Sequence, residues 1–199
     1  MMLVEETSVP SVALPVEEFR AHLRLGSGFS NDSLQDSVLE SFLWAAMAAI
    51  EARTGKVLIA REYSWELTRW RDRDQQVLPV APVTEILAVT VSDRTGGQSV
   101  GEAQEYRLVQ DHTRPRVRAN GARLPVIPTD ASIKLRFVAG FGPGWNDLPA
   151  DLRQAVLLLA AHYYEYRHET TLHGGCMPFG VTSLIERHRP VRMYLGGGQ

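Results

Sequence analysis

The most reactive side chains of this sequence lie close together in RHETTLHGGC (residues 167–176), at His168, His173 and Cys176. Histidine and cysteine could ligate zinc, but a structural zinc site needs four ligands and a catalytic site three, commonly in closely spaced pairs. The chain has one cysteine and contains neither CxxC nor HExxH. We therefore expect no metal site and no other cofactor.

Cys176 could instead act as a nucleophile, with His168 or His173 as its base. A reactive thiol usually has its pKa lowered by a helix N-terminus or by a neighbouring cation. Cys176 stands in a Gly-Gly-Cys-Met loop and has no such local support. A small cytosolic thiol hydrolase that uses Cys176 with a histidine stays open as an alternative function from a different class.

No other motif of the sequence predicts catalysis. AGFGPGW (139–145) is rich in glycine but lacks the lysine and the Ser/Thr of a phosphate-binding loop, so it is interpreted as a turn between a strand and a helix. The acidic residues are scattered and suggest no pair for general acid–base chemistry. We expect no catalytic residue, and this absence favours a binding or structural role.

Two local clusters of arginine could contact anions. In RPRVR (114–118), Arg116 and Arg118 flank Val117 and would share one face of a strand with Arg114 nearby, either toward DNA phosphates or along a solvated sheet edge. In ERHRPVRM (186–193), three arginines follow one acid. This tail could contact phosphate or dock on an acidic protein partner.

A helical N-terminal part, a β-rich middle and a helical C-terminal part must position these residues within a single domain. The pattern predicts an irregular arm over 1–13, two helices within 14–55 ending near Gly55, a β-rich region over 57–139, a long helix over 148–168 and a C-terminal segment over 181–199. Period-two alternation predicts strands at 63–67, 86–91, 106–109, 116–118 and 133–138.

Both long helices are apolar on more than one side. On the third helix, Leu152, Val156 and Leu159 share one face, and further apolar side chains occupy another. A helix that is apolar all round is buried all round, and a surplus of Trp, Tyr and Met is typical of an interface core. We expect a contact between subunits at Trp44, Met47, Leu157, Leu158 and Tyr164.

The composition is that of an ordinary globular protein, with 199 residues, 44% of them apolar and 22% charged. A net charge of −2 gives no global attraction to nucleic acid or to an anionic membrane. A single cysteine excludes an internal disulfide. The N-terminus, MMLVEETSVPSV, has no basic region of a signal peptide, and no apolar run reaches the ~20 residues of a membrane span. We expect a soluble protein that is made and used without secretion, with synthesis in the cytoplasm.

Six segments, in order, carry a family resemblance: PVEEFRAHLRL, AAIEARTGKVLIAREYSWEL, LPVAPVTEILAVTV, IKLRFVAGFG, LPADLRQAVLLLAAHYYEYR and GVTSLIERHR. Together they resemble the head–tail connector (adaptor) family of tailed bacteriophages and gene transfer agents. The resemblance covers roughly residues 14–189. The N-terminal arm, the 169–180 loop and the tail beyond Arg189 depart from it.

The resemblance implies a non-enzymatic ring, commonly a dodecamer, mounted on the portal of a filled capsid. Such a ring extends the DNA channel and presents a platform for the stopper and tail proteins. The implied fold is α+β and mainly helical, a helical bundle with an inserted β-rich region and a C-terminal docking segment. Another neck protein, a stopper or a tail terminator, is a further alternative, although those proteins tend to be dominated by β structure.

The resemblance also implies that the C-terminal segment contacts the portal. We expect its short helix to be mobile in the free chain, and a chain cut after Gly180 to keep its fold. Two apolar side chains would enter a groove of the portal, and arginines would pair with portal carboxylates. The residues expected at this interface are Leu184, Ile185, Arg187, Arg189, Arg192 and Tyr194.

Overall fold

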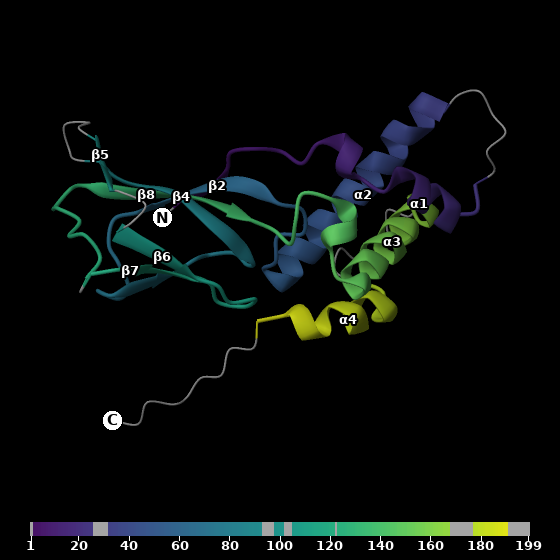
Figure 1. Cartoon of the computed structure of the whole chain (residues 1–199). Helices are drawn as coiled ribbons and strands as arrows, with labels where there is room; N and C mark the ends of the chain where they lie inside the picture. Colours follow the sequence, from purple (N-terminus) through teal and green to yellow (C-terminus); the bar gives the residue numbers. More distant parts are fainter. Residues whose placement is uncertain are drawn as a thin grey trace.

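Helices form one end of the molecule and two β-sheets form the other (Figure 1). The computed structural model describes residues 2–25, 32–92, 98–101, 105–121, 123–167 and 177–190. The α-helices are α1 (Val16–His22), α2 (Asp32–Thr54), α3 (Ala150–Glu165) and α4 (Phe179–Ile185). Short 3-10 turns lie at Ser11–Ala13, Trp145–Asp147 and Glu186–His188. Among these described helices, none is long and apolar enough to cross a bilayer.

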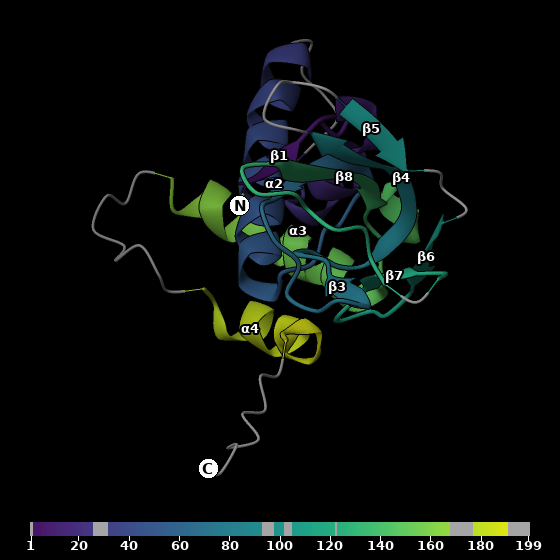
Figure 2. The ribbon, with the colours of Figure 1, turned by 90° about the vertical axis from the view of Figure 1, so that its left-hand side faces the viewer.

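The helical end is built around α2 and α3, which pack together. α1 packs against both helices (Figure 1), and α4 packs against α3 (Figure 2). On α2, Leu39, Leu43, Ala46 and Ile50 recur every three or four residues, and all four are fully buried. Val38, an apolar residue on another side of α2, is exposed. One apolar stripe of α2 therefore builds the core, and the other faces outward.

The five-stranded sheet is antiparallel, in the order β1-β2-β8-β4-β5, and a three-stranded sheet has the order β3-β7-β6. The strands are β1 (Met2–Glu5), β2 (Arg61–Leu67), β3 (Gln75–Val77), β4 (Val83–Ser92), β5 (Gln98–Gly101), β6 (Tyr106–Val109), β7 (Arg116–Ala119) and β8 (Ser132–Ala139). The two sheets share a second hydrophobic core, to which Val117 contributes from β7 and Phe137 from β8.

The alternation predicted for the strand at 133–138 is confirmed on β8. On β8, Ile133, Leu135 and Phe137 are fully buried, while the lysine and arginine between them are exposed. Tyr63 of β2 lies opposite Phe137, and their rings stack with centroids 5.9 Å apart. This stacked pair fixes the register of the two strands and places the apolar side chains of both on the core face.

Two glycines mark turns that other residues would strain. Gly55 ends α2 with φ at +66°, which confirms the predicted helix stop. Gly140, at the end of β8, has φ at +137°, and a Cβ there would lie 2.4 Å from the backbone of Ala60. The chain can therefore leave the sheet only by passing close to the segment that follows α2.

The expectation of a mainly helical bundle is wrong. Eight strands in two antiparallel sheets, with a core of their own, stand beside four helices in the described part of the chain. The short strands β3 and β5 have no alternating apolar pattern in QQV and QSVG, so periodicity could not reveal them. The arm expected to be irregular also contains β1, because pairing with β2 organises it.

Candidate functional site

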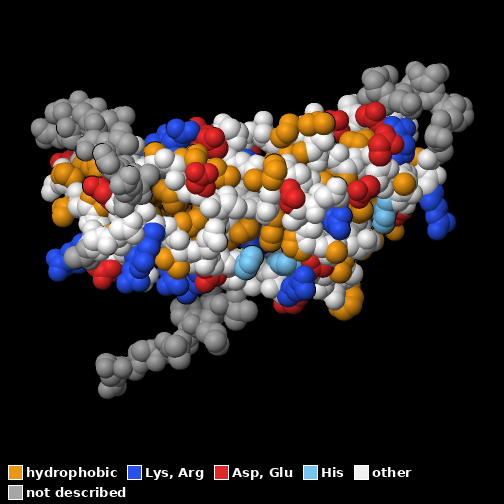
Figure 3. Space-filling view, viewed as in Figure 1, with side chains coloured by type: hydrophobic (Ala, Val, Ile, Leu, Met, Phe, Trp, Pro, Cys, Tyr) orange, Lys and Arg blue, Asp and Glu red, His pale blue; other side chains and the backbone are white. Residues whose placement is uncertain are grey.

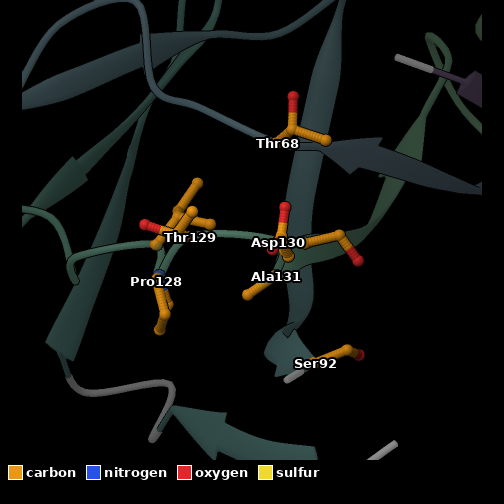
Figure 4. Close-up of a pocket in the computed structure, with 8 residues that line it drawn as sticks. Thr68, Ser92, Pro128, Thr129, Asp130 and Ala131 are labelled. Atoms are coloured by element: carbon orange, nitrogen blue, oxygen red, sulfur yellow. The ribbon is translucent and has the colours of Figure 1, made fainter. Parts of the chain in front are cut away.

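An open depression of about 530 Å³ lies where the ends of β2 and β4 meet the loop before β8 (Figure 4). Its lining is Thr68, Ser92, Ile127, Pro128, Thr129, Asp130, Ala131 and Ser132. Asp130 is the one ionisable side chain in this lining. Catalysis by acid–base or nucleophilic chemistry needs at least two positioned groups, so this depression holds no catalytic set.

A second hollow, of about 400 Å³, lies near the buried side chain of Lys56. The Lys56 amine donates to the carbonyl oxygen of His112. Burial lowers the pKa of Lys56, and the nearby charge of Asp111 opposes that shift. The Asp111 carboxylate accepts the backbone N–H groups of Thr113 (2.7 Å) and Arg114 (2.8 Å). Both charged groups therefore hold a loop in place.

The described residues contain no group of three or more His, Cys, Asp or Glu side chains that could hold a metal ion. His168, His173 and Cys176 lie outside these residues. The candidate sites in the described part of the chain are therefore exposed surfaces and not pockets.

Several apolar side chains of α2 and α3 are only half covered by the chain itself. Trp44, Leu157, Leu158 and Tyr164, all predicted at a subunit contact, are half-buried against the helical core. The ring of Tyr164 meets Phe42 edge-on, with centroids 5.7 Å apart. On its other side, the Arg167 guanidinium lies 4.5 Å from the Tyr164 ring centroid. Trp44, Leu157, Leu158 and Tyr164 therefore remain partly open to solvent, and together they are here called the helical face.

Met47 differs from the other predicted contact residues, because its side chain is only 1% exposed. It belongs to the fully buried core of the helical end. Its apolar character therefore serves the fold of the chain, and Met47 offers no surface to another subunit.

The C-terminal segment is docked on the chain's own helices. Val181 and Ile185 of α4 are fully buried in the helical core, and Leu184 is half-buried beside them. After α4, Arg187 Nε lies 2.6 Å and His188 Nε2 2.7 Å from Oδ2 of Asp151 at the start of α3. This arrangement of Asp151, Arg187 and His188 is called the clasp below.

The clasp is favoured by charge. Burial alone would raise the pKa of Asp151, but the hydrogen bonds and charges of His188 and Arg187 outweigh it and hold that pKa below its usual value. The His188 ring also meets Phe141 edge-on, at 6.5 Å between centroids. The Arg187 side chain remains 69% exposed although it contacts Asp151.

Two expectations about this segment are therefore wrong. The short helix is not a free element, because two of its side chains complete the core. For the same reason, a cut after Gly180 would remove core and not only a docking tail. Ile185 faces inward and Arg189 pairs with Glu186 at 3.1 Å, whereas Arg192 and Tyr194 lie outside the described residues.

The arginines of RPRVR do not lie on a sheet edge. Arg116 and Arg118 belong to β7, which is the central strand of the three-stranded sheet, so a position of this strand at the sheet edge is wrong. Arg118 lies opposite Arg107 of β6, and both side chains are exposed. Arg116 is half-buried, with Nη1 3.4 Å from Oε1 of Gln75.

These arginines are part of a larger basic surface at the small sheet. Residues 69–77 and 105–124 contain eight arginines and four acids, in a chain whose net charge is −2. Lys and Arg side chains gather over this end of the molecule (Figure 3). We call this surface the arginine face. Its members are Arg69, Arg71, Arg73, Arg107, Arg114, Arg116, Arg118 and Arg123.

Sequence reasoning missed the clasp and a buried ion pair between Arg61 and Glu51, which joins the two ends of the molecule. The clasp had a weak signal, since Asp151 opens a helix and ERHR carries the complementary charges. Nothing local connects Glu51 to Arg61 as partners, because one lies in a helix and the other in a strand.

No family model matches this chain, and no curated protein is similar to it. Solved structures are similar over 99% of this chain and 99% of theirs. One is the neck of an empty GTA particle computed with C6 symmetry, at 53% identity and a TM-score of 0.89. Another is the virion of a native gene transfer agent (GTA) particle, at 52% and 0.86. A third is the neck of a native GTA particle computed with C12 symmetry, at 50% and 0.84.

Proposed function

This chain belongs to the head–tail connector (adaptor) family of tailed bacteriophages and gene transfer agents, and from that membership we propose how it works in the particle. It is a structural component of the neck of a gene transfer agent particle. Twelve copies form a ring that sits on the portal, continues the DNA channel and presents a platform to the stopper and tail proteins. Its role is mechanical, without catalysis.

The observation that carries this proposal is the similarity along nearly the whole chain to proteins in such necks, one of them solved with C12 symmetry. A ring uses heterologous contacts, in which one patch of a subunit meets a different patch of the next. The helical face supplies one such patch, because Trp44, Leu157, Leu158 and Tyr164 are large, apolar and only half-buried.

Replacing Leu158 with lysine should exclude the chain from the ring. Burying an unpaired ammonium group at a subunit contact costs several kcal/mol, so incorporation should fall more than about tenfold. The measurement is the amount of variant in particles purified from a producer that lacks the wild-type chain. Val126→Lys is the matched control, since Val126 is also apolar, is 85% exposed and lies in a loop of the sheet end.

Thermal unfolding of each free variant separates assembly from folding. If Leu158→Lys lowers the melting temperature of the free chain, Trp44→Lys tests the α2 part of the helical face. If folded variants at both positions are incorporated normally, the helical face is not part of the contact between subunits. A particle with a single copy of the wild-type chain would contradict the ring itself.

The C-terminal segment is proposed to hold the ring on the portal. The clasp fixes α4 and the following turn against α3, so Arg189 and Pro190 have a defined position beside it. Leu184 is half-buried, and Arg187 and Arg189 keep exposed guanidinium groups beside it. Arg192 and Tyr194 would extend this contact, while Ile185 supports it from inside the core.

The arginine face is proposed to contact the phosphates of DNA in the channel. Phosphate contacts are indifferent to base sequence, and a ring around passing DNA must tolerate every sequence. The exposed side chains of Arg107 and Arg118 stand on adjacent strands of one sheet, so both reach the same surface. Such binding is weak at physiological salt and falls as salt rises.

Reversing two of these charges, with Arg107→Glu and Arg118→Glu together, should weaken binding of the free protein to a random-sequence duplex. The plot of log affinity against log salt should lose about two units of slope, roughly 0.9 for each lost phosphate contact. The matched control is Arg24→Glu together with Arg53→Glu, which changes the net charge by the same amount but at the helical end. An equal loss in that control, or a preference for one DNA sequence, would contradict the assignment.

A further inference from the structure

Strand β1 is an edge strand that leaves half of its backbone groups unpaired within the described chain. It pairs with β2 in the register Met2↔Glu66, Leu3↔Trp65, Val4↔Ser64 and Glu5↔Tyr63. It stands first in the sheet order, so no described strand lies on its other side. An edge of this kind is a template for pairing with another chain.

The pattern of hydrogen bonds between β1 and β2 identifies which backbone groups of β1 point away from β2. The N–H of Glu6 donates to the carbonyl oxygen of Glu62 at 2.8 Å. In an antiparallel pair, residues that exchange hydrogen bonds alternate with residues that do not. Glu6 and Glu62 continue the register of β1 and β2, so Met2 and Val4 point their backbone groups toward β2. The N–H and C=O of Leu3 and Glu5 therefore point toward the open side.

β1 lacks several of the features that prevent pairing at sheet edges. Natural edge strands are commonly protected by lysines, prolines or bulges, and MLVE contains none of these, although the strand is short and ends in a glutamate. Its apolar side chains are exposed on both faces, Met2 by 60%, Leu3 by 38% and Val4 by 36%. The two nearby acids form ion pairs with residues of the same sheet. Glu5 pairs with Arg61 of β2 at 3.2 Å, and Glu6 pairs with Lys134 of β8 at 3.4 Å.

The same sheet has a second open edge at its other end. β5 pairs only with β4, from Val89↔Gly101 to Ser92↔Gln98, and no described strand lies beyond it. β1 and β5 are different patches at opposite ends of one sheet order, as a heterologous contact that repeats around a ring requires. The β5 edge of a neighbouring copy could therefore supply the second strand partner that β1 lacks within the described chain.

We propose that β1 of each subunit adds as a strand to the β5 edge of a neighbouring copy. The proposal rests on the ring proposed above and adds a backbone contact to it. Leu3 and Glu5 exchange main-chain hydrogen bonds with the neighbour, and Met2, Leu3 and Val4 become covered. A four-residue strand is a small contact, so it acts together with the helical face.

Leu3→Pro tests the backbone contact with little effect on the chain's own sheet. Proline removes the N–H of Leu3, which points away from β2, and edge strands accept proline at such positions. The free variant should keep the wild-type melting temperature. In competition with wild-type chains during particle assembly, its incorporation should fall at least about tenfold, the equivalent of one or two lost hydrogen bonds at ~1.4 kcal/mol per factor of ten.

Leu3→Thr is the matched control, because it keeps the N–H and the preference for a strand while removing the apolar side chain. Its incorporation should fall clearly less than that of Leu3→Pro, because only the side-chain part of the contact is lost. Normal incorporation of Leu3→Pro, or an equal loss with Leu3→Thr, overturns strand addition. Absence of the wild-type chain from necks would instead defeat the proposed function, so the two failures are distinguishable.

A photoreactive methionine at position 2 identifies the occupant. In assembled particles, the cross-link should join Met2 to the peptide around 98–101 of a second copy. A cross-link from Met2 to a different neck protein, or to another part of this chain, overturns the proposal.

Discussion

A chain that ends at Pro190 and carries Arg189→Ala should fold normally but should leave DNA-filled heads without tails. The change removes Arg189 and everything beyond Pro190, including Arg192 and Tyr194, which are proposed to hold the portal. It keeps α4 and the clasp, so the helical core stays complete. Electron microscopy of particles from a producer that makes only this variant gives the fraction with tails, which should approach zero.

A cut after Gly180 is the informative comparison. It removes Val181 and Ile185, two fully buried side chains whose individual loss typically costs about 1–5 kcal/mol. That shorter chain should melt earlier or fail to fold, whereas the chain ending at Pro190 should melt like the full protein. If the chain ending at Pro190 still yields tailed particles, the portal contact lies elsewhere.

Replacing Arg61 with leucine should destabilise the chain by about 3–5 kcal/mol, because it leaves a buried carboxylate without its partner. Arg61 Nη2 lies 2.5 Å from Oε2 of Glu51, and the two side chains are 7% and 17% exposed. Arg61 Nε also donates to the Tyr63 hydroxyl at 2.8 Å. Urea unfolding of the free chain measures the loss. This ion pair joins the end of α2 to the five-stranded sheet, so the two ends of the molecule should also lose cooperativity.

The effect should depend on pH in a defined direction. Burial raises the pKa of Glu51, although the Leu58 N–H and Arg61 oppose the shift. Without Arg61 that pKa should rise further. A carboxyl whose pKa is higher in the folded than in the unfolded chain binds its proton more tightly when folded, so stability increases as pH falls through the folded pKa. The deficit of Arg61→Leu should be smaller near pH 5 than near pH 8.

Two controls separate the buried charge from the lost packing. Adding Glu51→Gln to Arg61→Leu removes the unpaired charge and should recover part of the stability. Arg136→Leu breaks an exposed pair with Glu62, at 2.7 Å, and should cost less than about 1 kcal/mol. Equal losses for Arg61→Leu and Arg136→Leu would show that the buried pair is not special.

The sequence predicted the elements whose signals are long and local. The helices α1, α2 and α3 and the Gly55 stop follow from apolar spacing and from cap residues. The alternation of β8 follows from its period of two. These features depend on neighbours within a few residues, which periodicity records directly. The family resemblance, too, came from ordered segments of sequence, and the solved necks support it.

The composition also favoured a binding or structural function over a catalytic one. With one cysteine and no pair of catalytic acids, the sequence favoured a binding or structural role over the alternative of a thiol hydrolase. The surplus apolar surface on the long helices predicted contacts beyond the chain itself, and that expectation became the proposed helical face. The sequence could not show which of these apolar side chains are buried in the core and which stay exposed for a partner.

The tertiary structure made that division. Met47 and Ile185 became core, whereas Leu158 and Leu184 stayed half-buried, although all four are apolar residues of helices. The reason is that burial depends on which element packs against each face, and those elements come from distant parts of the chain. Helical spacing gives the direction of a side chain relative to its own axis and carries no information about the neighbouring element.

The same reason explains the strands. RPRVR was consistent with an edge, but β7 lies in the centre because β3 and β6 pair with its two sides. MLVE carried no alternation, but β1 became an edge strand by pairing with residues more than fifty positions away. Strand neighbours are joined by backbone hydrogen bonds, which any residue other than proline can make. Side-chain pattern therefore determined the faces of strands in this protein, and only the folded chain decided their order and left β1 open.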